Sequence, residues 1–348
     1  QPFLFEQGEK RTVREEVQPA MRGMITDRYG KPLAVSTPVV TLWLNPQQVN
    51  VQQLPAVASD LGLSTRELVR KGERAASQGR SFLYLKRQVQ PEVAQLVLKR
   101  RIAGIYGDDD FRRFYPAAEV TAHTVGIVDV DGKGQEGLEL AFDEFLQGSE
   151  GSRQVVKDLY GNVIKQLKVN AVPKPGGDLA LTLDLRLQYL AYRELKAAVS
   201  QHHAKSGSAV LVDARSGDVL ALVNQPSYNP NNRSSLRAEN MRNRAIADLI
   251  EPGSTIKPFT VAAALNSGRY FPGSEINTAP GFVRVKNKTI RDHRNYGVLD
   301  ITGVITKSSN VGVTYLAHQV GAEGIWEFFS KAGIGQATVL GFPGEAVG

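Results

Sequence analysis

The spacing of apolar residues in the first third of the chain predicts several strands. Apolar and polar positions alternate from Arg22 to Val35 and are interrupted by Asp27–Gly30, which predicts a hairpin. Val39–Leu44 and Phe82–Gln88 have the composition of further strands. Before them, residues 1–21 are polar and charged and suggest a stalk. We therefore expect a β-rich beginning.

Helices are expected between these strands and after the last of them. Three segments favour them: residues 51–61, a segment that begins at residue 64, and residues 91–101. Ser64 and Glu67 have capping-box spacing, and Pro91 fits the first position of a helix. Asp108–Asp110 is interpreted as a solvated loop.

The second half begins after a break in the apolar pattern. Two prolines and two glycines in Val172–Asp178 interrupt every period, so this segment is interpreted as a domain boundary. Helical spacing of leucine and valine then predicts an amphipathic helix from Asp184 to about His202. Ser208–Asp213 and Asp218–Val223 flank a turn at Ala214–Gly217, which predicts a second hairpin.

A later run, Phe259–Leu265, is apolar on nearly all sides and predicts a buried helix. Pro258 fits only the first turn of a helix, where N–H groups lack intrahelical partners, so this helix should begin near Ser254. Gly268 is a plausible C′ residue. After a loop-rich stretch, further helices are predicted at residues 300–307, 311–320 and 322–332. The last should contribute three core side chains, Trp326, Phe328 and Phe329.

Composition narrows the kinds of chemistry. The 348 residues are 42% hydrophobic, which is enough for two domains with substantial cores. The 42 basic and 35 acidic residues are intermixed, with no single basic stripe, so nucleic-acid binding is not favoured. Cysteine is absent, which excludes disulfides and a thiol nucleophile. The histidines lack metal-ligand spacing, and no apolar run reaches the ~20 residues of a membrane helix.

The candidate chemistry centres on Ser254 and Lys257. They share one face at the start of the predicted helix, because residues three apart are neighbours. A Ser-x-x-Lys pattern occurs by chance about once in a few hundred positions. This one, however, is unique in the chain and is fixed to a helix start by the prolines around it. The positive end of the helix favours an alkoxide and disfavours a protonated lysine, so a serine nucleophile with a lysine base is expected.

A Ser-x-Asn pattern at Ser308–Asn310 follows the serine-lysine pair. Ser-x-x-Lys together with a Ser-x-Asn-type motif and Lys-Thr-Gly is typical of penicillin-binding proteins and class A β-lactamases. An earlier Ser-x-Asn, Ser227–Asn229, is followed by Pro230 and is interpreted as a loop.

These motifs make the chain resemble the class B penicillin-binding proteins, which are monofunctional peptidoglycan transpeptidases. Other segments resemble that family in the same order along nearly the whole chain: Arg22–Gly30, Arg113–Pro116 with Ala122–His123 and Gly126, Gly137–Glu139, Thr182–Asp184 with Gln188, and Asn243–Ala245. Glu251 before Pro-Gly, and Ser308–Asn310 in its Ser-Ser-Asn form, resemble the septal, division-specific branch.

The resemblance implies an α+β multidomain fold. Residues 1–172 would form a β-rich, non-catalytic, partner-binding pedestal domain. Arg113, Tyr115 and His123 resemble pedestal residues of the family, so structural roles are expected for them. Residues 179–348 would form a penicillin-binding transpeptidase domain, an antiparallel sheet flanked by helices, and the hairpin at 208–223 would pack on the Ser254 helix. The family's Lys-Ser/Thr-Gly motif lies on a later strand and none follows Asn310, so this domain is expected to be incomplete at its C-terminus.

The implied function is D,D-transpeptidation in septal cell-wall synthesis, without a cofactor. The implied catalytic roles are nucleophile for Ser254, base for Lys257, proton relay for Ser308, and positioning of substrate and lysine for Asn310. The donor substrate would be a stem peptide ending in D-Ala-D-Ala, and β-lactams would acylate the same serine. Two further residues are candidates for substrate binding, Ser309 and Glu251.

The family also implies a location and partners. Its members carry one membrane anchor upstream of the segment where this sequence begins. We therefore expect a bacterial inner-membrane protein whose single-pass anchor is missing from this chain and whose catalytic domain is in the periplasm. The expected partners are divisome membrane proteins, including a septal glycosyltransferase, and no nucleic acid.

Two other functions stay open. A serine β-lactamase would need a deacylating residue, and Glu345 lies near where one could be sought. However, Leu340–Glu345 resembles a class B loop, and a β-lactamase does not need about 170 residues of upstream domain. A non-catalytic division scaffold is the second alternative, because no third motif follows Asn310.

The chain as printed is expected to accept an acyl group poorly. Its hairpin at 208–223 would lack partner strands, and an isolated two-stranded sheet is marginal in water. The later strand should also supply the second oxyanion N–H, whose loss costs about 10²- to 10³-fold in rate.

Overall fold

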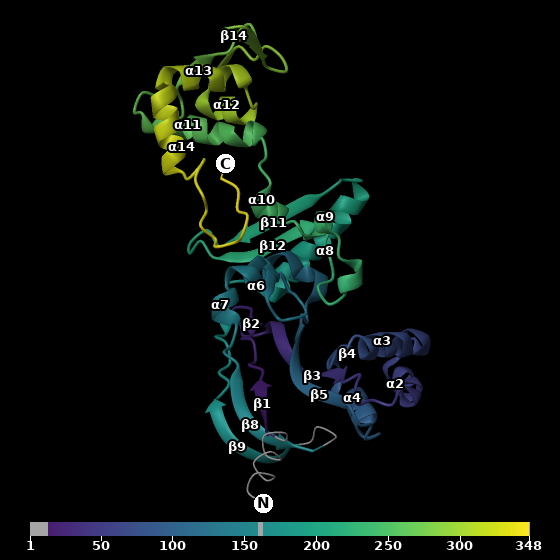
Figure 1. Ribbon diagram of the computed structural model, residues 1–348. Coiled ribbons are helices and arrows are strands. Elements are labelled where there is room, and N and C mark those ends of the chain that lie inside the picture. Colours follow the sequence, from purple (N-terminus) through teal and green to yellow (C-terminus); the bar gives the residue numbers. More distant parts are fainter. Residues whose placement is uncertain (1–12, 159–162, 348) are drawn as a thin grey trace, which may run out of the picture. The chain divides into compact units, whose positions relative to one another are not determined.

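The computed structural model describes residues 13–158 and 163–347. The chain divides into two compact units, Gln1–Ala245 and Ile246–Gly348 (Figure 1). The first unit includes the helix and the hairpin that follow the boundary expected at residues 172–178. The division into domains 1–172 and 179–348 therefore stays a prediction.

Two sheets form the framework of the first unit. One is antiparallel, in the order β1 (Val13–Gln18), β8 (Gly151–Lys157), β9 (Val163–Ala171). The other runs β10 (Leu179–Ala180), β2 (Ile25–Thr26), β3 (Pro32–Leu44), β4 (Leu83–Val89), with β5 (Ile105–Phe114) also paired to β3. The hairpin predicted at residues 22–35 is confirmed, since β2 and β3 pair antiparallel across Asp27–Gly30. The prediction of a separate strand at Val39–Leu44 is wrong, because these residues are the end of β3, a single strand of 13 residues.

The predicted helices beside this second sheet are confirmed. They are α2 (Leu54–Leu61), preceded by the 3₁₀ turn η1 (Val51–Gln53), then α3 (Thr65–Ser77) and α4 (Pro91–Leu98). The Ser64 hydroxyl caps α3 by accepting from the Glu67 N–H at 3.4 Å. These helices gather against β3, β4 and β5, and their apolar faces share one core with side chains such as Leu42 and Leu44 (Figure 1). Burial of this apolar surface stabilises the helices more than their propensity does.

The prediction of a loop at Asp108–Asp110 is wrong, because these residues lie in β5 and pair with β3. Side chains of β3 donate hydrogen bonds to two of these carboxylates. Thr41 Oγ1 donates to Asp110 Oδ2, and Trp43 Nε1 donates to Asp108 Oδ2, each at 2.7 Å. Burial raises the pKa of Asp108. A run of three acids thus fits a strand where the neighbouring strand supplies donors.

The structural roles expected for Arg113, Tyr115 and His123 agree with their contacts. Arg113 Nε donates to Glu139 Oε1 at 2.6 Å, while Arg22 Nε donates to the other oxygen of the same carboxylate at 2.7 Å. The Tyr115 hydroxyl accepts from the Val128 N–H at 3.0 Å. His123 Nε2 lies 2.8 Å from the Asn240 carbonyl. All three side chains are buried.

Replacement of Glu139 by alanine is expected to destabilise the first unit by about 3 to 5 kcal/mol, because it leaves two buried guanidinium groups without their shared carboxylate. Glu139 is 0% exposed, and its two arginines are 8% exposed. Thermal or denaturant unfolding measures the loss. The matched control is Glu144→Ala, which removes an exposed acid nearby. Equal stabilities for the two variants would contradict the assignment.

The amphipathic helix expected after the boundary is α8 (Leu185–Gln201). The Asp184 carboxylate caps it by accepting from the Arg186 N–H at 3.0 Å. Buried Gln188 fixes α8 to the following hairpin, since its side chain donates to the Leu222 carbonyl and accepts from the Leu222 N–H, each at 2.8 Å. That hairpin is confirmed as antiparallel β11 (Gly207–Val212) and β12 (Val219–Gln225). Its expected packing on the Ser254 helix stays a prediction.

Short elements complete this part of the chain: η2 (Ala118–Val120), α5 (Ala122–Val125), β6 (Ile127–Val128), β7 (Gly134–Glu136), α6 (Gly137–Ala141), α7 (Asp143–Leu146), η3 (Arg233–Ser235), α9 (Ala238–Met241) and α10 (Arg244–Ala247).

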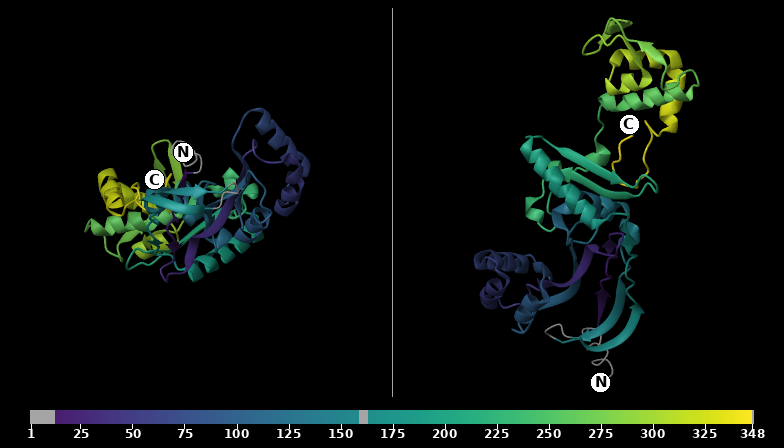
Figure 2. Two further views of the ribbon diagram at one scale, coloured as in Figure 1. Left: turned by 60° about the horizontal axis from the view of Figure 1, so that its bottom comes forward. Right: turned by 180° about the vertical axis from the view of Figure 1, so that it is seen from behind.

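The second unit consists mainly of helices at the predicted positions. They are η4 (Gly253–Ile256), α11 (Lys257–Asn266), α12 (Ile301–Thr306), α13 (Asn310–Val320) and α14 (Ala322–Lys331). Figure 2 shows α11 to α14 packed together, and a core that includes Val261, Ile301 and Leu316 joins three of them. The stretch expected to be loop-rich holds two small antiparallel ribbons. These are β13 (Glu275–Asn277) with β16 (Val298–Asp300), and β14 (Phe282–Val285) with β15 (Lys288–Arg291).

Two predictions about burial in this unit are wrong. Helix α11 is not buried on all sides, because Thr260, Val261 and Ala264 face the core while Phe259 is 40% exposed. Trp326 was expected in the core and is 69% exposed. Runs of small apolar residues give no clear face, so the pattern could not tell which side of the helix is covered. Within the residues described, no helix combines the length and hydrophobicity that crossing a membrane requires.

Candidate active site

The candidate nucleophile, Ser254, lies in the 3₁₀ turn η4, which continues directly into α11. Pro258 is in the first turn of α11 and Gly268 follows its end with φ of +73°, both as predicted. The serine is exposed at this helix start. Its hydroxyl is therefore accessible where the helix N-terminus places positive partial charge.

Lys257 joins the serine turn to the Ser-x-Asn motif. Its side chain is 9% exposed. Its Nζ lies 2.6 Å from the Ser308 carbonyl oxygen, 2.5 Å from Asn310 Oδ1 and 3.0 Å from Ser308 Oγ. The amine is thus held by three oxygens, all of which come from the second motif.

Ser308 completes a chain of polar atoms from lysine to nucleophile. It follows α12 and has a left-handed backbone with φ of +50°, which is uncommon for residues other than glycine. In this conformation both its carbonyl and its hydroxyl face Lys257. The Ser308 hydroxyl also lies 3.2 Å from Ser254 Oγ. Such local strain is characteristic of functional sites.

The environment lowers the pKa of Lys257 from its ordinary value. Burial is the main cause, because it penalises the charged ammonium, while the negative charge of Asp292 acts in the opposite direction. A lowered pKa increases the fraction of neutral amine at a given pH. The site therefore has a lysine adapted to accept a proton, as a nucleophile-base pair requires.

Two family models match the chain. Residues 17–181 match the penicillin-binding protein dimerisation domain, and residues 207–348 match the penicillin binding protein transpeptidase domain. The chain belongs to the class B penicillin-binding proteins. The serine, lysine and Ser-x-Asn described above all lie within the second match.

Curated relatives agree with this membership. The chain is 44% identical to the peptidoglycan D,D-transpeptidase FtsI of Escherichia coli K12, over 99% of this chain and 59% of that protein. It is 43% identical to the probable peptidoglycan D,D-transpeptidase PbpC of Pseudomonas aeruginosa, over 99% of this chain and 61% of that protein. The chain thus spans about three fifths of the length of these relatives.

A solved structure shows the same fold. The penicillin-binding protein PBP2 of Helicobacter pylori, in complex with MreC, superposes with a TM-score of 0.74 at 20% identity. The match covers 97% of this chain and 68% of that chain. The two-domain architecture of the penicillin-binding proteins is therefore present here.

A carboxylate that the sequence did not indicate supports the second motif of this penicillin-binding protein. Asp292 follows β15 and binds the start of α13 with both oxygens. Its Oδ2 accepts from the Ser309 hydroxyl at 2.7 Å, and its Oδ1 accepts from the Val311 N–H at 3.0 Å. Asn310 is held from the same strand, since its Nδ2 donates to the Arg291 carbonyl at 2.8 Å. The sequence predicts a loop-rich stretch at this position, so no local signal marks this carboxylate.

Replacement of Asp292 by asparagine is expected to shift the pH dependence of acylation to lower pH. The carboxylate raises the pKa of Lys257, so its neutralisation lowers that pKa further and makes the amine neutral at lower pH. The rising limb of the plot of acylation rate against pH should therefore move to lower pH. Acylation rates measured from neutral to alkaline pH test this. An Asp300→Asn control neutralises another carboxylate, one that caps α12. An unshifted profile for Asp292→Asn would contradict the coupling.

The two residues predicted to bind substrate are placed differently from the four predicted to be catalytic. Ser309 is 0% exposed, and its hydroxyl also accepts from the Gly312 N–H at 2.8 Å, so it caps α13. Glu251 is exposed just before the serine turn. Their roles in substrate binding stay predictions.

Two sequence matches lie outside this cluster. Ser227–Asn229 is a loop, as predicted. Lys205–Gly207 is a literal Lys-Ser-Gly, but it follows α8, ends at the first residue of β11 and lies ahead of the serine. The third motif of a penicillin-binding protein is expected on a strand after Asn310, so this match is not assigned to it.

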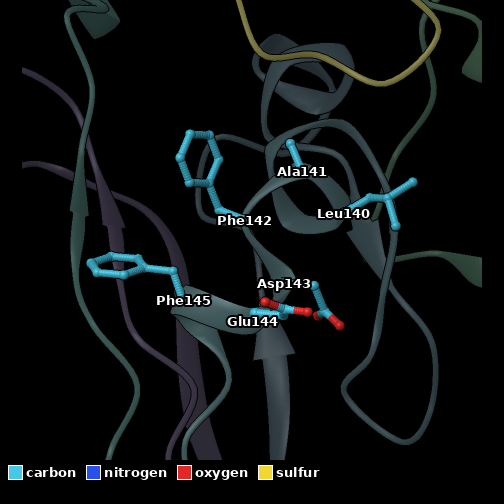
Figure 3. Close-up of a pocket in the computed structure, with 6 residues that line it drawn as sticks. All are labelled: Leu140, Ala141, Phe142, Asp143, Glu144 and Phe145. Carbon is cyan, nitrogen blue, oxygen red and sulfur yellow. The ribbon is translucent and has the colours of Figure 1, made fainter.

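A pocket of about 670 Å³ in the first unit is lined by the consecutive residues 140–145 (Figure 3). Two acids belong to it. Asp143 accepts from Arg22 Nη1 at 2.7 Å and from the Gly134 N–H at 2.8 Å, so its carboxylate is structural. The pocket contains none of the serine, lysine and asparagine chemistry, and we assign it no catalytic role.

Proposed function

We propose that this chain belongs to a peptidoglycan D,D-transpeptidase of septal cell-wall synthesis that works through a Ser254 acyl-enzyme. The single observation that supports it most is the continuous line of polar contacts from Ser254 through Ser308 to Lys257. The relatives FtsI and PbpC, which are named as peptidoglycan D,D-transpeptidases, support the same reaction. The FtsI relative and the Ser-Ser-Asn form of the second motif support the septal role.

The contact geometry suits a neutral Lys257. A neutral amine has two N–H donors and one lone pair. The two shortest contacts, to the Ser308 carbonyl and to Asn310 Oδ1, would take the two N–H groups. The lone pair could then accept from the Ser308 hydroxyl, whose oxygen would in turn accept from Ser254, since a hydroxyl both donates and accepts. Protons would move from nucleophile to base along this line.

The proposed reaction has two acyl-transfer steps. Ser254 Oγ attacks the carbonyl carbon of the penultimate D-Ala, and its proton passes through Ser308 to Lys257. The C–N bond to the terminal D-Ala then breaks, and the protonated relay returns that proton to the leaving amine. In the second step the amine of an acceptor peptide attacks the ester carbonyl carbon and the C–O bond to Ser254 breaks. The proton lost by that amine returns to Ser254 Oγ through Lys257 and Ser308. The Ser254 N–H, in the first turn of the helix, would donate to the oxyanion.

Partners and location are part of the same proposal. The first unit would be the pedestal that binds divisome membrane proteins, including a septal glycosyltransferase, and the catalytic unit would lie in the periplasm below a membrane anchor. A partly exposed aromatic cluster supports a binding role for the first unit. Trp43 lies 5.0 Å from Phe82 and 4.5 Å from Tyr106, centroid to centroid, and Phe82 is 42% exposed.

The proposal is tested with a longer form of the protein that extends through a Lys-Ser/Thr-Gly strand. A labelled penicillin should form a stable adduct, and a peptide ending in D-Ala-D-Ala should release D-alanine and slow the labelling. Rapid turnover of a chromogenic cephalosporin would instead favour the β-lactamase. Absence of any adduct would favour the non-catalytic scaffold.

A further inference from the structure

The β14–β15 hairpin concentrates positive charge in a unit whose remaining residues include more acidic than basic side chains. Five basic residues fall between positions 284 and 294: Arg284, Lys286, Lys288, Arg291 and Arg294. The same stretch has one acidic residue, Asp292, and that carboxylate is engaged with Ser309 and Val311. All five basic residues are exposed. Within the described part of the chain, none of them forms a salt bridge.

The register of the hairpin gathers part of this charge on one face. Phe282 pairs with Arg291 and Arg284 pairs with Thr289, and cross-strand partners point to the same side of a ribbon. The Arg291 guanidinium lies 5.3 Å from the centre of the Phe282 ring. The intervening positions, Val283 and Ile290, are only partly exposed. One face therefore carries two arginines and an aromatic ring, while the other carries Val283, Val285 and Ile290 together with one lysine, Lys288.

The base of this hairpin is joined to the catalytic motif. The carbonyl of Arg291 accepts from Asn310 Nδ2 at 2.8 Å. The next residue, Asp292, holds the start of α13, where Asn310 and Val311 lie. A ligand on the cationic face near Arg291 would thus be close in the structure to the Ser-x-Asn motif. Figures 1 and 2 show the hairpin extending from the end of the helical cluster at which α12 and α13 lie.

We propose that this cationic face of β14–β15 binds free carboxylates of the acceptor peptide in the transpeptidation reaction, with Arg284 and Arg291 as the residues that contact them. This rests on the function proposed above and adds a substrate subsite to it. Guanidinium groups match carboxylates in geometry and charge, and unpaired cations in solution-exposed positions attract anionic groups over about a Debye length. The aromatic ring of Phe282 offers an apolar contact to the part of the peptide next to its carboxylates.

The test measures peptide binding with the longer form of the protein. The probes are a fluorescent tripeptide with two free carboxylates and the same tripeptide with both carboxylates amidated. Arg284→Gln should raise the Kd of the free acid about two- to fivefold, and Arg284→Gln with Arg291→Gln about three- to tenfold, as expected for one and two exposed ion pairs. The Kd of the free-acid peptide for wild type should also rise with salt concentration. The amidated peptide should bind wild type no more tightly than the free-acid peptide binds the double variant.

The control is Lys331→Gln, which removes one positive charge from the exposed end of α14 and should leave the Kd unchanged. Penicillin acylation of Arg284→Gln should equal that of wild type. If acylation of the wild-type protein fails, the proposed function is wrong. If acylation occurs but neither substitution changes the Kd of the free-acid peptide, the subsite is wrong. The subsite is also wrong if the face binds anionic phospholipid vesicles and not the peptide.

Discussion

Ser254→Ala is expected to abolish covalent labelling by penicillin in the longer form of the protein. Ser254 is the exposed hydroxyl at the helix start, and its Oγ lies 3.2 Å from the Ser308 hydroxyl that connects it to the base. No other described residue combines these two features with a lysine three positions on. The loss should be complete, because the bond to the drug forms at this oxygen. Gel fluorescence after incubation with a labelled penicillin measures it.

Two controls separate chemistry from folding. Ser227→Ala alters the other Ser-x-Asn, which is a loop in the first unit, and should label like wild type. The unfolding temperature of Ser254→Ala should match that of wild type, since the replaced side chain is exposed. Full labelling of Ser254→Ala would reject the serine as nucleophile.

Lys257→Met is expected to lower the limiting acylation rate about 10²- to 10⁴-fold, the usual contribution of a general base. Methionine keeps most of the volume of the buried stem but removes the amine that contacts Ser308 and Asn310. Stopped-flow measurement over several drug concentrations separates the limiting rate from the first encounter, which should weaken much less. Lys307→Met is the matched control, because it removes an exposed lysine close in sequence to Ser308.

An unchanged limiting rate for Lys257→Met would show that the lysine is not the base. A loss of the same size in Lys307→Met would show that the effect is a general one of charge. Thermal unfolding should accompany both measurements, because Lys257 also joins α11 to the segment that begins α13.

The sequence alone could place Ser254 beside Lys257 as a candidate catalytic pair, because the geometry of that pair is local. Pro258 permits only a helix start, and this places Ser254 and Lys257 on one face. The second motif could be joined to the first only through the resemblance, since nothing in the residues says that Ser308 folds back onto Lys257. The structure supplies that step, with a lysine amine surrounded by oxygens of Ser308 and Asn310.

Other features depended on tertiary contacts that no local pattern carries. Asp292 is one acid in a basic, polar stretch, and its function appears only when β15 lies beside α13. Asp108–Asp110 looked like a loop because three adjacent acids disfavour a strand, yet Thr41 and Trp43 donate to two of them from the neighbouring strand. The exposure of Trp326 likewise depends on which face of α14 is covered.

The most direct test of the central claim is to locate the adduct. The longer form of the protein is incubated with penicillin and digested, and the modified peptide is sequenced by mass spectrometry. The account predicts one increment, equal in mass to the whole drug, on the peptide that contains Ser254 and on that oxygen. An adduct on Ser308 or Ser309 would contradict it.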